Sequence, residues 1–283
     1  MEILGGPEDQ QDPQGNATYL IWYQNSEARP RTYNMYASAD GGATKFRLNR
    51  TRTTGFTGDL DQDGTEAIYQ EIRRGQSNIQ IIDLASRARS NPPAGINTRQ
   101  WEWAPRLSDE FILFEREFPR TDRSRLILFD RNAQTNATLL DVHTRIWIYP
   151  YDVGSQYASW EREDNTGWSA WIYDIVAETK TRIPTVNNQL QYAPVVDELH
   201  WNVYWVRSGR GNCGNNVRIL RAPVSSLDTP TVVATMPDGV DVWTQSLEQN
   251  VADGRIDLLF TRYRCRNNQG DLYEVQGVDT LGP

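Results

Sequence analysis

Three aspartates in one short stretch have the spacing of a calcium-binding loop. Asp59, Asp61 and Asp63 alternate with other residues, and Gly64 follows them. Alternate carboxylates can converge on a hard cation, and the glycine permits the sharp turn that such a loop needs. The twelfth position, where such loops carry a carboxylate, is Gln70. The stretch predicts either a structural Ca²⁺ site or an ordinary Asp-Gly turn, and no other cofactor is expected.

Signals for catalysis are sparse in the rest of the chain. His143 and His200 are the only histidines, so a metal centre with three histidine ligands is excluded. The sequence holds no G-x-S-x-G nucleophile elbow and no glycine-rich phosphate loop after a strand-like segment. Paired carboxylates for glycosidase chemistry stay open, because 37 acidic residues give many chance pairs. A protein without catalytic activity is favoured over an enzyme.

A repeat of about 45 residues must position these groups. Apolar segments that end in an aromatic residue recur as YLIWYQ, EAIYQE, FILFER, YASWER, VYWVR and LLFTR. A second strand-like segment follows each one, as in LILFDR, and a shorter one precedes it, as in QWEWAPRL. Four antiparallel strands per unit are typical of a propeller blade. The sequence predicts an all-β fold, a single six-bladed β-propeller of four-stranded antiparallel blades.

The repeats fill the whole chain. The predicted blades cover about residues 1–50, 51–97, 98–143, 144–187, 188–238 and 239–283. The inner strand of the first blade is expected within residues 2–6. No run of 18 apolar residues exists, so no transmembrane helix is expected. The first residues also lack the basic and apolar regions of a signal peptide, which indicates a cytosolic protein or a trimmed native N-terminus.

The repeat resembles that of the TolB-like propellers, which also form the propellers of prolyl-oligopeptidase-type peptidases. WAPRLSDEFILFERE with LILFDRNAQTNATLL carries the resemblance, as do YAPVVDELHWNVYWVRSG and NMYASADGGATKFRL. The resemblance covers nearly the whole chain. It is to the propeller alone, and the N-terminal domain of TolB and the peptidase domain have no counterpart in this sequence. It implies a fold and leaves the function open. Oligogalacturonate lyases resemble this fold too, but their histidine-rich metal site has no counterpart in two histidines.

Arginine is concentrated on one predicted face. In a propeller, the loops between second and third strands share a face with the loops between blades, and we call this face the top. Arginines gather in these loops, and acidic residues gather in the opposite turns, which a net charge of −8 conceals. The arginines predicted to bind a ligand there are Arg52, Arg73, Arg74, Arg99, Arg116, Arg145, Arg162, Arg207, Arg210, Arg262 and Arg264. Their guanidinium groups would pair with carboxylate or phosphate, unless the loops carry them for solubility and pair them with local acids.

Arg116, Arg162, Arg207 and Arg262 form a subset of their own. Each follows the aromatic residue of its strand by two positions, so each side chain points to the same side of its sheet. They form either an arc that faces a ligand or a set of pairs between blades, with acids such as Asp130 or Asp174 on the neighbouring strand. We favour the pairs.

Aromatic residues of the inner strands are the other candidate contacts. They include Trp101, Trp103, Trp147, Tyr149, Tyr192 and Trp243. Most such residues pack between blades. Trp101 and Trp147 are nevertheless predicted to contact a ligand at the mouth of the channel, where an aromatic ring suits a sugar or a peptide.

The two cysteines are predicted to form a disulfide. Cys213 and Cys265 lie in equivalent top loops of the fifth and sixth blades, which adjacent blades place side by side. The alternative is two unrelated exposed thiols. A disulfide would indicate an oxidising compartment, such as the periplasm, the cell surface or the exterior.

Together these features favour a binding module of the cell envelope or exterior. The expected partner is an anionic glycan or an acidic protein surface on the arginine-rich top face. Nucleic acid is disfavoured, because no nucleic-acid motif accompanies the arginines. The alternatives are a lyase or hydrolase that acts on an acidic glycan, and a structural subunit of a surface assembly.

Overall fold

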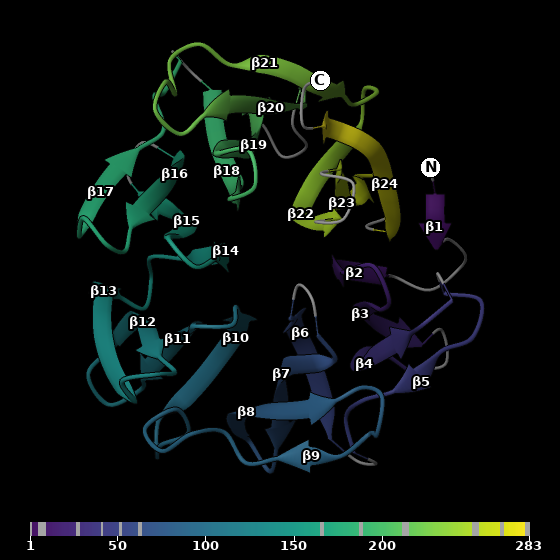
Figure 1. Ribbon diagram of the computed structural model, residues 1–283, viewed down its shortest axis with the longest axis vertical. Helices are drawn as coiled ribbons and strands as arrows, with labels where there is room; N and C mark the ends of the chain where they lie inside the picture. The colour runs from purple at the N-terminus through teal and green to yellow at the C-terminus, as the bar shows by residue number, and fades with distance from the viewer. Residues whose placement is uncertain are drawn as a thin grey trace.

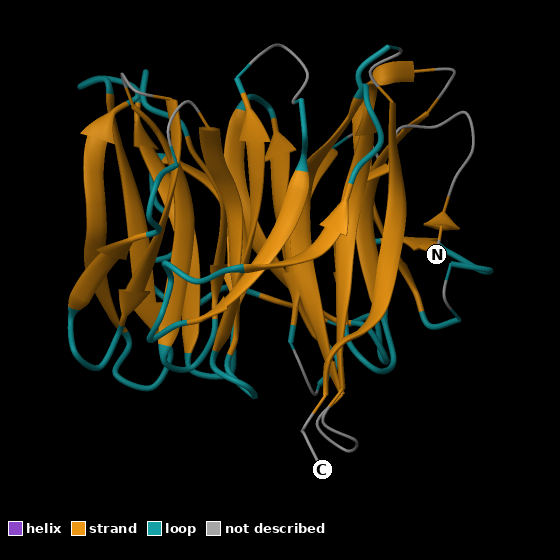
Figure 2. Cartoon of the chain, turned by 90° about the horizontal axis from the view of Figure 1, so that it is seen from above, coloured by secondary structure: helices purple, strands orange, loops and turns teal. Residues whose placement is uncertain are grey.

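The chain folds into six four-stranded antiparallel sheets that stand around a ring (Figure 1). The computed structural model describes residues 2–4, 10–26, 29–40, 42–50, 53–61, 64–164, 167–186, 189–210, 215–250, 255–266 and 269–280, and these contain no helix. Most strands run between the two faces of the disc when it is seen from the side (Figure 2). The all-β fold and the six blades of four strands are therefore confirmed.

Each blade carries its strands from the inside of the ring outward. Blade 1 holds β2 (Gln10–Gly15), β3 (Leu20–Ser26), β4 (Arg29–Ser38) and β5 (Phe46–Arg47). Blade 2 holds β6 (Thr54–Leu60), β7 (Glu66–Arg73), β8 (Gln76–Asp83) and β9 (Arg89–Ser90). Blade 3 holds β10 (Trp101–Leu107), β11 (Phe111–Phe118), β12 (Arg123–Asp130) and β13 (Thr135–His143).

The other three blades follow the same order. Blade 4 holds β14 (Ile148–Val153), β15 (Tyr157–Asp164), β16 (Gly167–Asp174) and β17 (Thr179–Arg182). Blade 5 holds β18 (Gln189–Asp197), β19 (Asn202–Gly209), β20 (Arg218–Pro223) and β21 (Thr231–Thr235). Blade 6 holds β22 (Val240–Asn250), β23 (Arg255–Arg264), β24 (Gln269–Thr280) and, as its outermost strand, β1 (Glu2–Leu4).

The assignment of the first inner strand to residues 2–6 was wrong. Residues Glu2–Leu4 pair with β24, and the inner strand of blade 1 is Gln10–Gly15 instead. The segment QQDPQG has little apolar character, so hydrophobic patterning did not reveal it as a strand. Blade 6 is thus assembled from both ends of the chain, which closes the ring (Figure 1).

The recurring aromatic residues form the core between the sheets. They lie on the second strand of each blade and are at most 3% exposed: Trp22, Tyr69, Phe114, Trp160, Trp205 and Phe260. Their spacing explains the period of the sequence, because each ring must fill the gap between its own blade and the neighbouring one.

Each inner strand contains a register shift near its middle, as a β-bulge does. Asp12, Ala104 and Ala193 have positive φ angles of 53°, 43° and 49° at this position, and a proline follows each of them. A bulge interrupts the ladder of hydrogen bonds, so it tolerates a proline, which lacks an amide hydrogen. The repeated x-Pro motif of the sequence therefore marks the bulges.

The preceding blade satisfies the amide that the bulge exposes. The N–H of Ala104 donates to Oε1 of Gln70 over 3.2 Å, and the N–H of Ala193 donates to Oε2 of Glu161 over 2.7 Å. Both acceptors directly follow the core aromatic residue of their strand. Side chains at this position therefore connect neighbouring blades near the channel.

Candidate functional site

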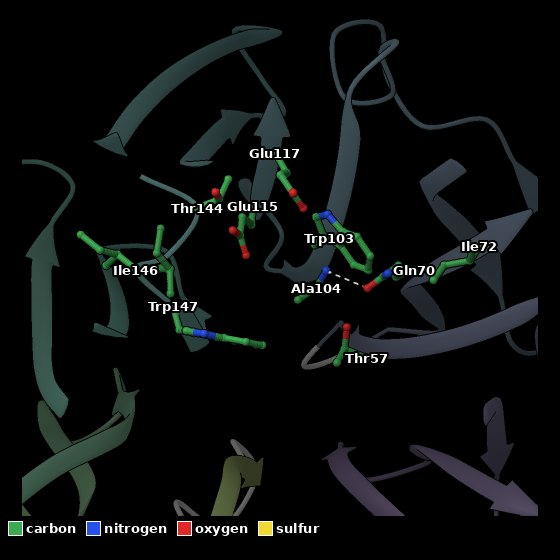
Figure 3. A pocket seen from close by; sticks show the side chains of 11 residues that line it. Thr57, Gln70, Ile72, Trp103, Ala104, Glu115, Glu117, Thr144, Ile146 and Trp147 are labelled. Atoms are coloured by element: carbon green, nitrogen blue, oxygen red, sulfur yellow. Dashed lines mark hydrogen bonds between the residues drawn. The ribbon is translucent and has the colours of Figure 1, made fainter. Parts of the chain in front are cut away.

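A pocket of the described surface lies among blades 2, 3 and 4, and we call it the Trp147 pocket (Figure 3). Its volume of about 560 Å³ falls within the range of about 300–1,000 Å³ that is usual for small-molecule sites. Its lining residues are Thr57, Gln70, Ile72, Trp103, Ala104, Glu115, Glu117, Thr144, Ile146, Trp147 and Ile148. They come from β6, β7, β10, β11, β14 and the loop between blades 3 and 4.

The walls of this pocket are mostly aromatic and aliphatic. Trp147 is 65% exposed in the loop before β14, and its ring extends into the opening from the side of blade 4 (Figure 3). Trp103, Gln70 and Thr57 lie on the opposite side. The prediction placed Trp147 in the contact surface, and the structure places it in the wall of a pocket.

Two buried polar atoms in the pocket wall lack a hydrogen-bond partner among the described residues. The first is Nε2 of Gln70, a side chain that is 2% exposed and whose Oε1 is already engaged by the N–H of Ala104. The second is Oγ1 of Thr57, on a side chain that is 9% exposed. A buried polar atom without a partner costs about 1–3 kcal/mol, so a polar group that enters the pocket, from water or from a ligand, can pair with these two atoms.

Two carboxylates from one strand also face the pocket. Glu115 and Glu117 lie two residues apart on β11, so their side chains point to the same side of the sheet (Figure 3). Burial raises the pKa of Glu115 to about 7, the hydrogen bond from the Ser124 hydroxyl opposes the rise, and the charge of Glu117 adds to it. The Trp147 pocket thus disfavours anions.

Exposed arginines on the top loops of blades 2, 3 and 4 form what we call the arginine rim. They are Arg73, Arg74, Arg99, Arg120 and Arg145. Arg73 follows the pocket residue Ile72, and Arg145 lies between the pocket residues Thr144 and Ile146. Within the described part of the chain, none of these guanidinium groups pairs with an acid. Four of the five belong to the predicted contact surface, and Arg120 joins them.

Other arginines of the predicted surface hold the fold together. The Nε of Arg116 lies 3.1 Å from Oε1 of the fully buried Glu102, and its Nη2 donates to the carbonyl oxygens of Gly95 and Ile96. Arg264 lies 2.8 Å from Asp271. The partner of Arg116 is an acid on the adjacent inner strand of its own blade, whereas the predicted pairs join neighbouring blades.

The rest of the arginine arc is half-buried. Arg207 donates to Gln191 over 3.3 Å, and desolvation together with the charge of Arg218 lowers the pKa of Arg207. The Nε atoms of Arg162 and Arg262 are buried and have no partner among the described residues.

The remaining predicted contacts are dispersed. Arg210 is exposed on blade 5, Arg52 lies outside the described residues, and Trp101, 36% exposed, packs edge-on against Trp103 at a centroid distance of 5.9 Å. The predicted surface is therefore divided between a rim, a set of structural pairs and isolated positions.

The aspartates of the predicted calcium loop have different surroundings. Asp59 is buried, and its carboxyl group accepts the N–H of Leu107 over 2.6 Å; burial raises its pKa to about 8. Asp61 is half-buried at the end of the strand, and Asp63 lies outside the described residues. Within the described ranges, no group of three or more Asp, Glu, His or Cys side chains could hold a metal ion.

Of the two cysteines, the structure describes one. Cys265 follows β23 and is not a free thiol, whereas Cys213 lies outside the described residues. Over the described ranges, the structure holds no helix that is long and apolar enough to cross a membrane.

The polar wall of the Trp147 pocket was not predicted from the sequence. Gln70 entered only as an unsuitable calcium ligand, and Glu115 and Glu117 were not singled out as site residues. Their alternation in the segment FEREF puts two carboxylates on one side of a strand, which was the available signal. The contribution of blade 2 depends on packing between blades, which no local pattern records.

Comparisons with solved structures confirm the fold. A putative TolB from Agrobacterium tumefaciens superimposes with a TM-score of 0.62 at 12% identity, over 97% of this chain and 92% of that one. TolB from Acinetobacter baumannii superimposes with a TM-score of 0.61 at 10% identity, over 92% of this chain and 65% of that one. An oligogalacturonate lyase in complex with manganese superimposes with a TM-score of 0.59 at 13% identity, over 95% of this chain and 79% of that one. No family model and no curated protein matches the sequence. The predicted resemblance to TolB-like propellers therefore holds as a likeness of fold.

Proposed function

We propose that this protein is a non-catalytic binding module of the cell envelope or exterior. Its arginine rim contacts an anionic or acidic partner, either an acidic glycan or an acidic protein surface. The only cofactor in the proposal is the structural Ca²⁺ that the Asp59–Asp63 spacing predicts. Neither nucleic acid nor a membrane span is part of the proposal.

The observation that carries this proposal is the contrast between the rim and the other arginines. Arg116 and Arg264 have acidic partners at 3.1 and 2.8 Å, whereas the five rim arginines are exposed and pair with no acid in the described part of the chain. Unpaired guanidinium groups gathered on one face attract anions and offer them bidentate hydrogen bonds.

A glycoside hydrolase is the second candidate, and the carboxylates of the Trp147 pocket favour it. Glu115 and Glu117 lie on one side of β11, and the pKa of Glu115 is raised to about 7, as a general acid requires. Release of reducing ends from a bound oligosaccharide, lost in Glu117→Gln, would establish this activity. A stable complex without turnover would exclude it for that ligand.

The cell-envelope location rests on the proposed Cys213–Cys265 disulfide. Cys265 is not a free thiol, and the chain contains one other cysteine. Disulfides persist in oxidising compartments, which supports the periplasm, the cell surface or the exterior.

The test is retention on immobilised polygalacturonate and on an immobilised polyaspartate, at low and at high salt. A triple variant Arg73→Gln, Arg74→Gln, Arg145→Gln should bind about five- to twelvefold more weakly at low salt, because each exposed ion pair contributes about 0.3–0.5 kcal/mol. A control variant with Arg47→Gln, Arg87→Gln and Arg182→Gln removes the same charge elsewhere and should bind normally. Equal loss in both variants, or no binding of either polymer, would refute the proposal.

A further inference from the structure

We propose that the Trp147 pocket binds an uncharged, hydroxyl-rich ring, such as one unit of a neutral sugar chain. This ligand differs from the anionic partner of the arginine rim, and the inference does not depend on the rim. It rests on three properties of the pocket: its unpartnered polar atoms, its aromatic walls and its carboxylates.

The unpartnered atoms require both a donor and an acceptor from the ligand. Nε2 of Gln70 can only donate, so the ligand must present an acceptor there. The carboxylate of Glu117 can only accept, so the ligand must present a donor on that side. A hydroxyl group serves in both roles, and Oγ1 of Thr57 can pair with one in either direction.

The aromatic walls indicate a ligand with a flat apolar face. Trp147 and Trp103 line opposite sides of the pocket, and Ile72, Ile146 and Ile148 complete its apolar surface (Figure 3). An exposed indole ring on a loop gains most from burial against a ring of C–H groups. A sugar ring combines such a face with a rim of hydroxyl groups.

The polar groups of the pocket disfavour the charged alternatives. An anionic sugar would bring a further negative group beside Glu117 and the partly protonated Glu115, which costs free energy in a partly buried site. An ammonium group would suit the carboxylates but has no acceptor, so Nε2 of Gln70 would stay unpaired. An uncharged, hydroxyl-bearing ligand meets both requirements.

Isothermal titration of the full chain with neutral tetrasaccharides tests this inference. The probes are cellotetraose, maltotetraose, mannotetraose and chitotetraose, with tetragalacturonate as the acidic probe and a trilysine peptide as the cationic one. At least one neutral probe should bind saturably, with similar affinity at low and at high salt. Tetragalacturonate and trilysine should show no binding that depends on Trp147.

Two variants and a matched control locate the binding. Trp147→Ala should weaken it at least tenfold, whereas Trp243→Ala should not, because Trp243 is a similarly exposed tryptophan (47%) on blade 6 that does not line the pocket. Gln70→Glu should also weaken it at least tenfold. This change keeps the acceptor for Ala104, as Glu161 does for Ala193, and replaces the amide donor with a carboxyl group.

Several results would overturn the inference. They are the absence of binding for all four neutral probes, unchanged affinity in Trp147→Ala or Gln70→Glu, and Trp147-dependent binding of the acidic or cationic probe instead. The rim variant should bind neutral probes normally, so failure of the proposed function and failure of this inference give different patterns.

Discussion

Nη2 of Arg106 lies 2.7 Å from Oδ1 of Asp12 in the interior of the ring, where the two side chains are 2% and 0% exposed. Arg106 is on the inner strand of blade 3, and Asp12 is on the inner strand of blade 1. The Nη1 atom of Arg106 also donates to the carbonyl oxygen of Gly58 on blade 2, over 2.8 Å. One guanidinium group thus joins three blades around the central channel.

Removal of this group should destabilise the ring severely. Arg106→Met leaves Asp12 as a buried charge without its cation, and such changes typically cost about 3–5 kcal/mol. Urea unfolding monitored by tryptophan fluorescence measures the free energy of unfolding. Arg131→Met is the control, because the Arg131–Glu66 pair has the same 2.7 Å separation but is 26% and 31% exposed, and should cost about 1 kcal/mol or less. Similar losses in both variants would contradict the structural role of Arg106.

The stability of the protein should fall as the pH rises from about 4 to 8. Burial raises the pKa of Asp59 to about 8 and that of Glu115 to about 7, so the folded state retains protons that the unfolded state releases near pH 4. The free energy of unfolding is therefore largest at a pH below the pKa values that these two carboxyl groups have in the unfolded state. It decreases as the pH rises to the pKa values that they have in the folded state. Urea midpoints at pH 5 and pH 8 test the sign. Asp59→Asn should flatten this dependence, whereas Asp109→Asn, at an exposed turn, should not.

Glu198 should be intolerant of the isosteric change to glutamine. One carboxylate oxygen accepts the N–H of Ser155 over 2.7 Å, and the other accepts the N–H groups of Gln156 and Tyr157 over 2.8 Å each. An amide nitrogen cannot accept these bonds. In either orientation of the amide, Glu198→Gln therefore leaves the N–H donors to one of the two oxygens without an acceptor. We expect a loss of about 1–3 kcal/mol in urea unfolding. Glu110→Gln at an exposed turn should leave the free energy of unfolding unchanged. An equally small effect of Glu198→Gln would refute a stabilising role for the hydrogen bonds that Glu198 accepts.

The proposed Cys213–Cys265 disulfide should be detectable directly. A thiol titration of the denatured, unreduced protein should find no free thiol, and digestion without reductant should yield one peptide pair that contains both cysteines. Cys265→Ser should lower the free energy of unfolding by about 2–4 kcal/mol, because the unfolded chain loses the cross-link. A control substitution, Ser225→Ala at an exposed turn of blade 5, should change it little. Two titratable thiols in the native protein would contradict the disulfide.

The blades were predictable because their signal is local and repeated. An aromatic residue after an apolar run must fill the space between two sheets, so the position recurs with the blade, as Trp160 and Trp205 illustrate. The x-Pro motif was visible for a similar reason, although only the structure assigns it to a bulge. Ala104 and Ala193 adopt positive φ angles there, and the sequence contains no residue type that requires them.

The site was less predictable because it depends on contacts between blades. The arginine-rich top loops predict a basic face, but composition alone could not separate exposed Arg145 from Arg116, which pairs with buried Glu102. The Trp147 pocket requires Gln70 of blade 2 to lie opposite a loop that precedes blade 4. Sequence spacing does not encode that distance. The strand Glu2–Leu4 was misplaced for the same reason, since its partner β24 lies at the other end of the chain.

The composite sixth blade also constrains when folding can finish. Glu2 pairs with Tyr273, so β1 must wait for a partner strand that is synthesised about 270 residues later. Blades 1 to 5 each draw their strands from one continuous segment and can form during synthesis. Until β24 emerges, however, β1 has no partner strand, and exposed strand edges promote association between chains. We therefore expect a nascent chain that lacks β24 to depend more on a chaperone than a chain in which blade 6 is assembled.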